Sequence, residues 1–273
     1  MGAIGHVVER ALTGQVTRLV RIDRTKAPLR PDEAAVDVAI VCVKTHGTAW
    51  AADVGARVLA PDGMAITIQN GLGNYEALVA TVGPERAAVG VIYVGAWLDE
   101  QGELHATGPG RVELGRPTGA GPRRVFEKLV AALGAGEMTV TAKDDAWPSV
   151  WRKLVTNAAV NPTTALFGYT NAELLADVAA SRVADGLAAE VARVATASGV
   201  AVSEDEACRW WREMAALTGA NRSSMLQDVQ AGRPTEVDAI CGAVQREGER
   251  RGTSAPLNQA MTVLVRALEP AAA

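Results

Sequence analysis

The chain has 273 residues, of which 48% are hydrophobic and 21% charged, as expected for a globular protein with one large or two moderate domains. A formal net charge of −4 without a long basic run argues against nucleic-acid and anionic-membrane surfaces, and no apolar stretch reaches the length of a membrane span. Three scattered cysteines and three distant histidines predict neither a disulfide framework nor a metal site, so we expect a metal-free cytoplasmic protein.

The first half of the chain alternates strand-like and helix-like runs. Val36–Lys44 is a short, β-branched apolar run, typical of a strand buried in a parallel sheet, and Gly63–Gly71 repeats the pattern before an Asn-Gly turn signal. Alternating units of this kind predict an open, doubly wound α/β sheet. Further strands are expected within Ala87–Asp99 and Glu103–Gly115, and helices over Thr48–Val58, Tyr75–Val82 and Pro122–Leu133.

From Asp144 onward the strand signals stop and helical periodicity replaces them. We therefore predict an α/β domain over residues 1–143 and an all-helical domain over residues 144–273. Asn171 and Ser203 are expected helix N-caps, and Pro162 is expected to bend or break the first helix. The predicted helices are Trp147–Leu166, Asn171–Ser198, Ser203–Leu217, Ser223–Ala231, Thr235–Arg251 and Pro256–Leu268.

A polar stripe runs along the first of these helices. Lys153, Asn157 and Asn161 lie at i, i+4 and i+8, so on a helix they share one face over about 12 Å. The rest of the segment is largely apolar, and buried polar groups need partners. Lys153 alone is compatible with a solvent-facing lysine, but the whole stripe predicts a site for an anionic or carbonyl substrate.

Several segments resemble the ketopantoate reductase family, in the same order along the chain. They are VCVKTH, IQNGLGNYEAL, VWRKLVTNAAVNPTTAL, SSMLQDVQAGRPTEVDAICGAV and APLNQ, and together they cover about Val36 to Met261. The resemblance implies a Rossmann domain followed by an all-helical domain, and NADPH-dependent reduction of 2-dehydropantoate to pantoate. It also implies a small-molecule keto-acid substrate, and a homodimer is compatible with it.

The resemblance also assigns roles to individual residues. Lys153 corresponds to the catalytic lysine and Glu236 to the essential acid, while Asn157, Asn161 and Ser224 correspond to substrate-binding positions. Asn70 is similar to the asparagine between cofactor and substrate, and Lys44 to a cofactor-contacting lysine. Hydride transfer to a ketone builds negative charge on its oxygen, which a positioned ammonium can stabilise and protonate.

The N-terminus departs from the family pattern. A dinucleotide fingerprint needs a strand leading into G-x-G-x-x-G, whereas this chain begins MGAIGHVVERAL, in which Gly2 and Gly5 match only the end of the loop. The first domain is therefore expected to be an incomplete Rossmann-like domain that lacks its first strand. Gln15–Arg24 is a candidate for the second strand, with Arg21 or Arg24 near a 2′-phosphate.

Two explanations stay open for this departure, a misplaced start and a real loss of NADP binding, and we expect weak NADPH binding by the chain as it stands. Two alternatives to a reductase follow. One is a ketopantoate-reductase-like enzyme without a working cofactor site, using Lys153 and Glu236 for cofactor-independent isomerisation or cyclisation. The other is a protein that only binds a small molecule.

Overall fold

The computed structural model describes residues 2–22, 35–99 and 101–270. The chain forms two compact units. The first, called the α/β unit, comprises the residues up to Gln69 together with Gly73–Ala146. The second, called the helical unit, comprises Asn70–Leu72 and the chain from Trp147 onward. A three-residue segment from the first half of the sequence therefore belongs to the helical unit.

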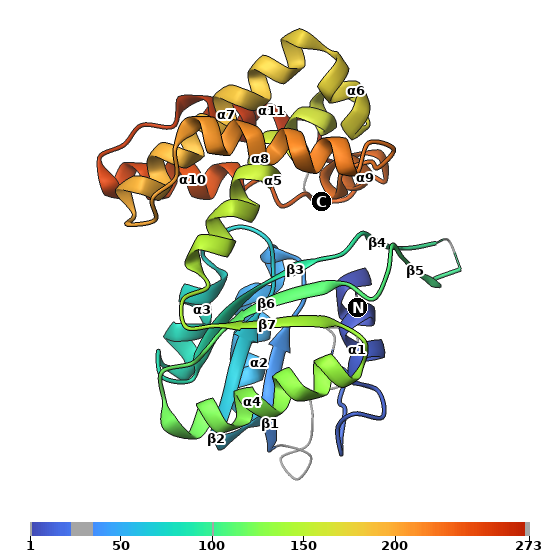
Figure 1. The fold of residues 1–273 in the computed structure, drawn as a ribbon, viewed down its shortest axis with the longest axis vertical. Coiled ribbons are helices and arrows are strands. Elements are labelled where there is room, and N and C mark those ends of the chain that lie inside the picture. The colour runs from blue at the N-terminus through green and yellow to red at the C-terminus, as the bar shows by residue number, and fades with distance from the viewer. Residues whose placement is uncertain (1, 23–34, 100, 271–273) are drawn as a thin grey trace. The chain divides into compact units, whose positions relative to one another are not determined.

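The α/β unit contains a five-stranded sheet in the order β1-β2-β3-β6-β7 (Figure 1). Strands β1, β2 and β3 are parallel, β6 is antiparallel to β3, and β7 is parallel to β6. A separate two-stranded hairpin, β4-β5, follows β3. The strands are β1 (Val36–Val41), β2 (Leu59–Thr67), β3 (Ala87–Tyr93), β4 (Ala96–Leu98), β5 (Leu104–Ala106), β6 (Arg111–Gly115) and β7 (Thr139–Lys143).

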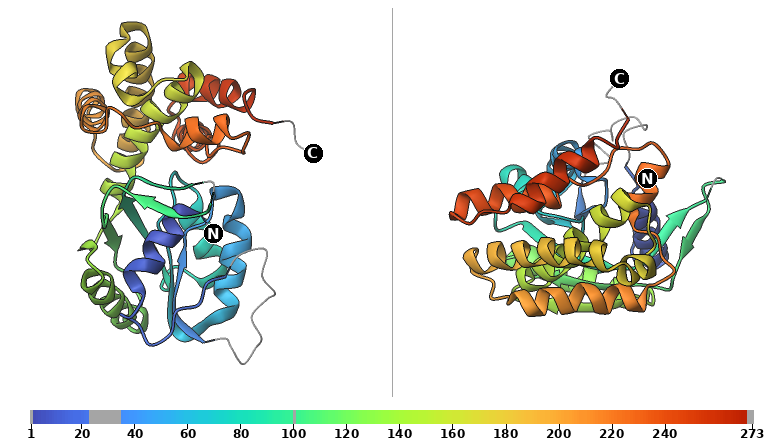
Figure 2. Two further views of the ribbon diagram at one scale, coloured as in Figure 1. Left: turned by 90° about the vertical axis from the view of Figure 1, so that its right-hand side faces the viewer. Right: turned by 90° about the horizontal axis from the view of Figure 1, so that it is seen from above.

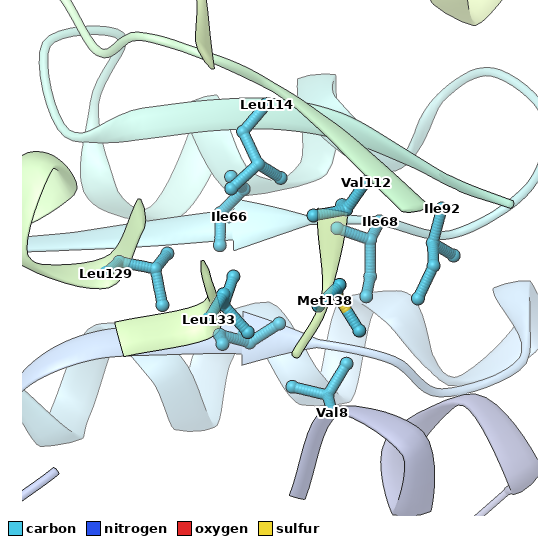
Figure 3. Close-up of a pocket in the computed structure, with 10 residues that line it drawn as sticks. Val8, Ile66, Ile68, Ile92, Val112, Leu114, Leu129, Leu133 and Met138 are labelled. Carbon is cyan, nitrogen blue, oxygen red and sulfur yellow. The ribbon is translucent and has the colours of Figure 1, made fainter. Parts of the chain in front are cut away.

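Helices cover both faces of this sheet because its strands are apolar on both sides. Ile66 and Ile68 point toward α1 (Ala3–Leu12) and α4 (Ala120–Ala135), around an apolar pocket (Figure 3). Ala65, the residue before Ile66, packs in the opposite direction. The opposite face is covered by α2 (Thr48–Val58), preceded by the short 3-10 helix η2 (Thr45–Gly47), and by α3 (Asn74–Val82). This layering is a Rossmann-like doubly wound arrangement.

The α/β unit differs from the sequence-based expectation in its strand boundaries. Strand β2 runs from Leu59 to Thr67, so Gln69 and Asn70 lie in the loop after the strand. The strand β7 was not predicted, because Thr139–Lys143 is half-exposed and lacks a long apolar run. No strand forms over residues 15–22, contrary to the prediction for Gln15–Arg24, while residues 23 and 24 lie outside the described part of the chain.

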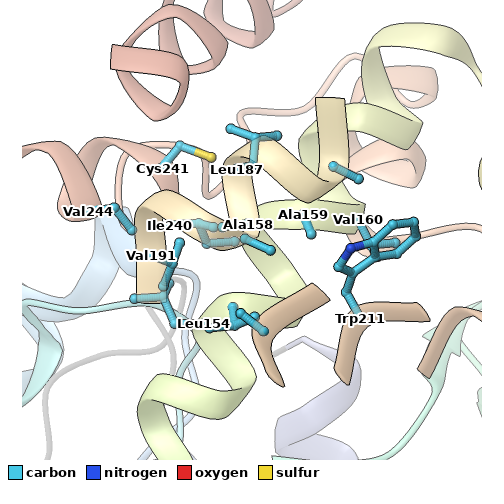
Figure 4. Close-up of a cluster of buried hydrophobic side chains, with 14 of the residues drawn as sticks. Leu154, Ala158, Ala159, Val160, Leu187, Val191, Trp211, Ile240, Cys241 and Val244 are labelled. Atoms are coloured by element: carbon cyan, nitrogen blue, oxygen red, sulfur yellow. The ribbon is translucent and has the colours of Figure 1, made fainter. Parts of the chain in front are cut away.

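The helical unit is organised around α5 (Trp147–Phe167), which packs against five other helices of the unit. Its small residues Ala158 and Ala159 allow a close approach to the alanine-rich helix α7 (Val178–Ala197), and the shared core is shown in Figure 4. Helix α7 also packs against α8 (Glu204–Leu217) (Figure 2). The remaining helices are α6 (Asn171–Ala176), α9 (Ser224–Gln230), α10 (Cys241–Arg251) and α11 (Pro256–Arg266).

Side-chain hydroxyls and carboxylates determine where these helices begin and end. The predicted N-cap Ser203 is confirmed at the start of α8, where it forms a capping box with Glu206, but α6 is capped by Thr170 in place of the predicted Asn171. Asp177 accepts from two backbone N–H groups and so starts α7, which splits the single helix predicted over 171–198. Pro162 does not break α5, which continues to Phe167, and just after the proline the Thr163 hydroxyl donates to the carbonyl of Ala159.

The described residues contain neither a membrane-spanning helix nor a metal-binding cluster. None of their helices is long and apolar enough to cross a membrane. No group of three or more His, Cys, Asp or Glu side chains within the described ranges is arranged to hold a metal ion.

Candidate active site

The polar stripe predicted from the sequence lies on α5. Because α5 is continuous from Trp147 to Phe167, Lys153, Asn157 and Asn161 follow one another along one side of the helix. Asn161 is 7% exposed, and Lys153 and Asn157 are half-buried. Among the described residues, no hydrogen-bond partner of the Asn157 and Asn161 side-chain amides is found, so both amides are available to a ligand.

The ammonium group of Lys153 has an unusual environment. Burial lowers the pKa of Lys153 from 10.5 to about 8, and the nearby carboxylate of Glu236 opposes this shift by favouring the charged form. A lysine with a pKa near 8 can give up a proton at physiological pH far more readily than a solvent-exposed lysine. The Lys153–Glu236 pair therefore has the properties of a proton donor with an adjacent charge partner.

Glu236 lies in a buried turn between α9 and α10. The segment Thr235–Ile240, called the Glu236 turn, was predicted as the start of a helix, but α10 begins only at Cys241. Within the turn, the backbone N–H groups of Ala239 and Ile240 both donate to the Glu236 carbonyl at 3.1 Å. The Glu236 side chain is 6% exposed, and its Oε2 accepts a hydrogen bond of 3.0 Å from Nδ2 of Asn70.

The segment Asn70–Leu72 packs directly onto the Glu236 turn. The backbone N–H of Leu72 donates to the carbonyl of Ala239 at 2.9 Å. Gly71 has a φ of +80°, and a Cβ at this position would lie 2.0 Å from the Ala239 carbonyl oxygen. Only glycine fits here, so the Asn-Gly pair that resembles a simple turn signal also brings Asn70 to Glu236.

Ser224 is the first residue of α9 and is exposed. Its neighbour Ser223 is buried and caps α9 by accepting from the N–H of Leu226 at 3.1 Å. The Ser223 hydroxyl also accepts from the Thr164 hydroxyl at 2.7 Å and lies 3.5 Å from the Asn161 carbonyl. These bonds hold the start of α9 beside the end of the polar stripe. Ser223 and Thr164 were missed in the sequence, although the paired serines before an apolar run are an N-cap signal.

The predicted cofactor-binding residues Gly2, Gly5 and Lys44 all belong to the α/β unit, whereas Asn70 belongs to the helical unit. Gly2 is the N-cap residue of α1, and no side chain caps the N–H groups at the start of this helix. Gly5 is buried within the first turns of α1. Lys44 follows β1 and starts η2. Arg21 forms an ion pair with Glu9 at 3.4 Å, and Arg24 lies outside the described residues.

A network of polar side chains at the carboxyl ends of β1 and β2 was missed in the sequence. The Gln69 amide donates to the Val43 carbonyl and to the Thr48 hydroxyl, both at 2.8 Å. The Thr48 hydroxyl in turn donates to Asn74 at 2.8 Å. Ligands of open α/β sheets bind at this edge, so the network fixes the loops there. The sequence does contain a signal for this network, because polar residues directly follow the two buried strands.

The α/β unit of Rossmann-like topology, followed by a helical unit that holds Lys153, Glu236 and Asn70 together, corresponds to a two-domain oxidoreductase. Two family models match the chain: Ketopantoate reductase PanE/ApbA over residues 2–119, and Ketopantoate reductase PanE/ApbA C terminal over residues 145–269. The chain therefore belongs to the ketopantoate reductase family, and it is an oxidoreductase of that family.

Relatives and solved structures agree with this membership. A 2-dehydropantoate 2-reductase of Halobacterium salinarum is 36% identical over 257 residues, covering 91% of this chain and 84% of the relative. One from Archaeoglobus fulgidus is 33% identical, covering 88% and 78%. The structure of 2-dehydropantoate 2-reductase from Geobacter metallireducens GS-15 has a TM-score of 0.82 at 26% identity, covering 98% and 97%. A D-mandelate dehydrogenase solved with NADH and anilino(oxo)acetate has a TM-score of 0.80 at 25% identity, covering 88% and 77%.

Proposed function

We propose that this protein reduces 2-dehydropantoate, or a closely related 2-keto acid, to the 2-hydroxy acid with NADPH. The observation that carries the proposal is the Lys153 ammonium, whose pKa is lowered to about 8 beside Glu236, which Asn70 binds in turn. Relatives at 36% and 33% identity are named 2-dehydropantoate 2-reductase, which supports the choice of substrate.

The residues of the helical unit have distinct parts in this reaction. A reduced nicotinamide, when bound, supplies the hydride to the carbonyl carbon. Lys153 stabilises the negative charge that develops on the carbonyl oxygen and gives that oxygen its proton. Glu236 favours the protonated form of Lys153 before the reaction, and Asn70 orients the Glu236 carboxylate. The amides of Asn157 and Asn161 and the hydroxyl of Ser224 bind the carboxylate and hydroxyl groups of the substrate.

Features of the α/β unit fit a dinucleotide. The N–H groups at the start of α1 carry no side-chain cap, and Gly2 offers no side chain that would keep a pyrophosphate away. Lys44 follows the carboxyl end of β1, the sheet edge at which dinucleotides bind. Gly2, Gly5 and Lys44 would therefore hold the phosphates of the cofactor. A related D-mandelate dehydrogenase was solved with NADH, which supports a nicotinamide cofactor.

Purified protein with 2-dehydropantoate and either NADPH or NADH tests the proposal by the loss of reduced-nicotinamide absorbance. We expect turnover by the wild type, faster with NADPH, and a loss of roughly 10²–10³-fold in kcat for Lys153→Ala, because a transition-state donor is removed. Lys128→Ala, at an exposed lysine of α4, is the matched control and should keep full activity.

Two outcomes would overturn the proposal. One is a folded Lys153→Ala variant, checked by circular dichroism, with wild-type turnover. The other is consumption of the keto acid at the same rate without any nicotinamide, which favours cofactor-independent acid–base chemistry. A homodimer in the cytoplasm is part of the same proposal, and sedimentation of the purified protein tests its assembly state.

A further inference from the structure

The Glu236 turn is bound by a segment from the far end of the chain. The backbone N–H and the hydroxyl of Thr235 both donate to Oε1 of Glu269, at 2.8 and 2.5 Å. The Thr235 hydroxyl also accepts from the N–H of Val237 at 3.2 Å. Glu269 lies beyond the end of α11, so one carboxylate oxygen fixes the residue immediately before Glu236.

Two arginines bind Asp238, which follows Glu236 in the same turn. Arg266, the last residue of α11, pairs with both carboxylate oxygens of Asp238, with N···O distances of 2.5 and 3.2 Å. Arg246 of α10 donates to the Asp238 backbone carbonyl at 2.8 Å. A two-point Arg–carboxylate contact sets orientation as well as distance. It also offsets the negative charge of Asp238, which lies two residues from Glu236 in the sequence.

The turn needs such external contacts because it is not part of a helix. Glu236 is followed by four turn residues before α10 begins, so no continuous ladder of i→i−4 bonds holds its backbone. Asn70 and Leu72 bind the turn at the Glu236 carboxylate and at the Ala239 carbonyl. The C-terminal residues bind it at Thr235 and Asp238, which bracket Glu236 in sequence.

We propose that Glu269 and Arg266 are positioning residues for Glu236, which set where its carboxylate lies relative to Lys153 and Asn70. The inference rests on the proposed function, since it assigns the two residues an effect on the same reaction. Neither residue touches substrate or cofactor in this scheme. Their effect is transmitted through the Glu236 turn, and small displacements of catalytic groups are costly, on the order of 10²-fold in rate for about 1 Å.

The test compares three variants with one control. Glu269→Ala removes the acceptor of both Thr235 bonds, Glu269→Gln keeps a carbonyl oxygen in its place, and Arg266→Gln removes the contact to Asp238. Glu213→Gln is the control, since Glu213 is an exposed carboxylate of α8 with an ion pair to Arg209 and no part in the turn. The readouts are kcat and KM, the pH profile of kcat/KM, and hydrogen exchange of backbone amides across 235–240.

For Glu269→Ala we expect a fall of roughly ten- to hundred-fold in kcat with a smaller change in KM. The alkaline limb of its pH profile should move to lower pH, because a displaced Glu236 favours the protonated form of Lys153 less. Exchange of the Thr235 and Val237 amides should become faster. Glu269→Gln should bring kcat, the pH limb and the exchange rates most of the way back to their wild-type values. Arg266→Gln should change the same three quantities in the same direction as Glu269→Ala, but by less. Glu213→Gln should leave all three unchanged.

A general loss of stability would not move the pH limb, so an unshifted limb with unchanged kcat in folded Glu269→Ala overturns the proposal. If Glu269→Ala does not fold, Arg266→Gln decides by the same readouts, because the Arg266 side chain is 57% exposed and its replacement disturbs the core little. If the wild type shows no keto-acid reduction, the proposed function fails on its own. The exchange rates then decide the positioning role, and unchanged rates in the variants overturn it.

Discussion

Lys153 is the proton donor of the proposed reaction, and its titration gives a direct prediction. Below a pH of about 8 the ammonium is present and can donate its proton, and above this pH it is lost. We therefore expect kcat/KM for keto-acid reduction to be level at lower pH and to fall tenfold per pH unit above about 8. In Glu236→Gln the falling limb should shift to lower pH, because the carboxylate that favours the charged lysine is removed.

Full pH profiles of both proteins, with either nicotinamide held saturating, provide the measurement. Glu213→Gln serves as the control for loss of a surface carboxylate and should follow the wild-type profile. A limb at the same pH in Glu236→Gln and the wild type would show that Glu236 does not act on the titrating group.

Polar contacts join the elements that carry the proposed substrate-binding residues, as at the start of α9. Ser223 caps α9 and accepts from Thr164, three residues after Asn161 on α5. Ser223→Ala should cost about 1 kcal/mol as a lost N-cap. It should also raise KM for the keto acid severalfold, with a smaller effect on kcat, because Ser224 is no longer held beside Asn161.

The matched control is Ser203→Ala, which removes the N-cap of α8 in the same helical unit. Both variants lose a capping hydroxyl, so similar falls in melting temperature are expected from both. Only Ser223→Ala should change KM. Equal KM values in the two variants would mean that the cap of α9 stabilises the fold without positioning Ser224.

For the whole molecule, periodicity was enough to predict the architecture. Runs that are apolar on both faces predicted β1, β2 and the doubly wound sheet, and helical periodicity predicted the helical second half. The errors are local and have physical causes. Asp177 caps α7 and so divides a run that is continuous in its apolar pattern, and Thr139–Lys143 is too exposed to read as a buried strand.

The candidate site was predictable only in part. Lys153, Asn157 and Asn161 share a helical face, so a local period reveals them, and the family resemblance added Glu236 and Asn70. Glu269 contacts Thr235 across 34 residues of sequence, and Arg266 contacts Asp238 across 28. Contacts at such separations leave no periodic signal, because the fold of the helical unit alone brings these residues together.

The lowered pKa of Lys153 also affects the stability of the whole chain. The folded-state pKa of about 8 lies below the unfolded value of 10.5, so the unfolded chain binds more protons between these two pH values. The free energy of unfolding therefore contains a contribution that rises with pH across this window. At about 1.4 kcal/mol per pKa unit, the contribution reaches about 3 kcal/mol. Lys153→Met has no titrating group at this position, so its free energy of unfolding lacks this contribution.

We therefore expect the wild type to gain about 3 kcal/mol of unfolding free energy relative to Lys153→Met between pH 7 and about 10.5. Urea unfolding at several pH values, followed by tryptophan fluorescence, measures the difference. The signal suits the purpose because Trp147, Trp151, Trp210 and Trp211 all lie in the helical unit. Other groups titrate equally in both proteins and cancel. Lys128→Met should run parallel to the wild type, and a Lys153→Met curve that also runs parallel would place the lysine in a solvated, unperturbed environment.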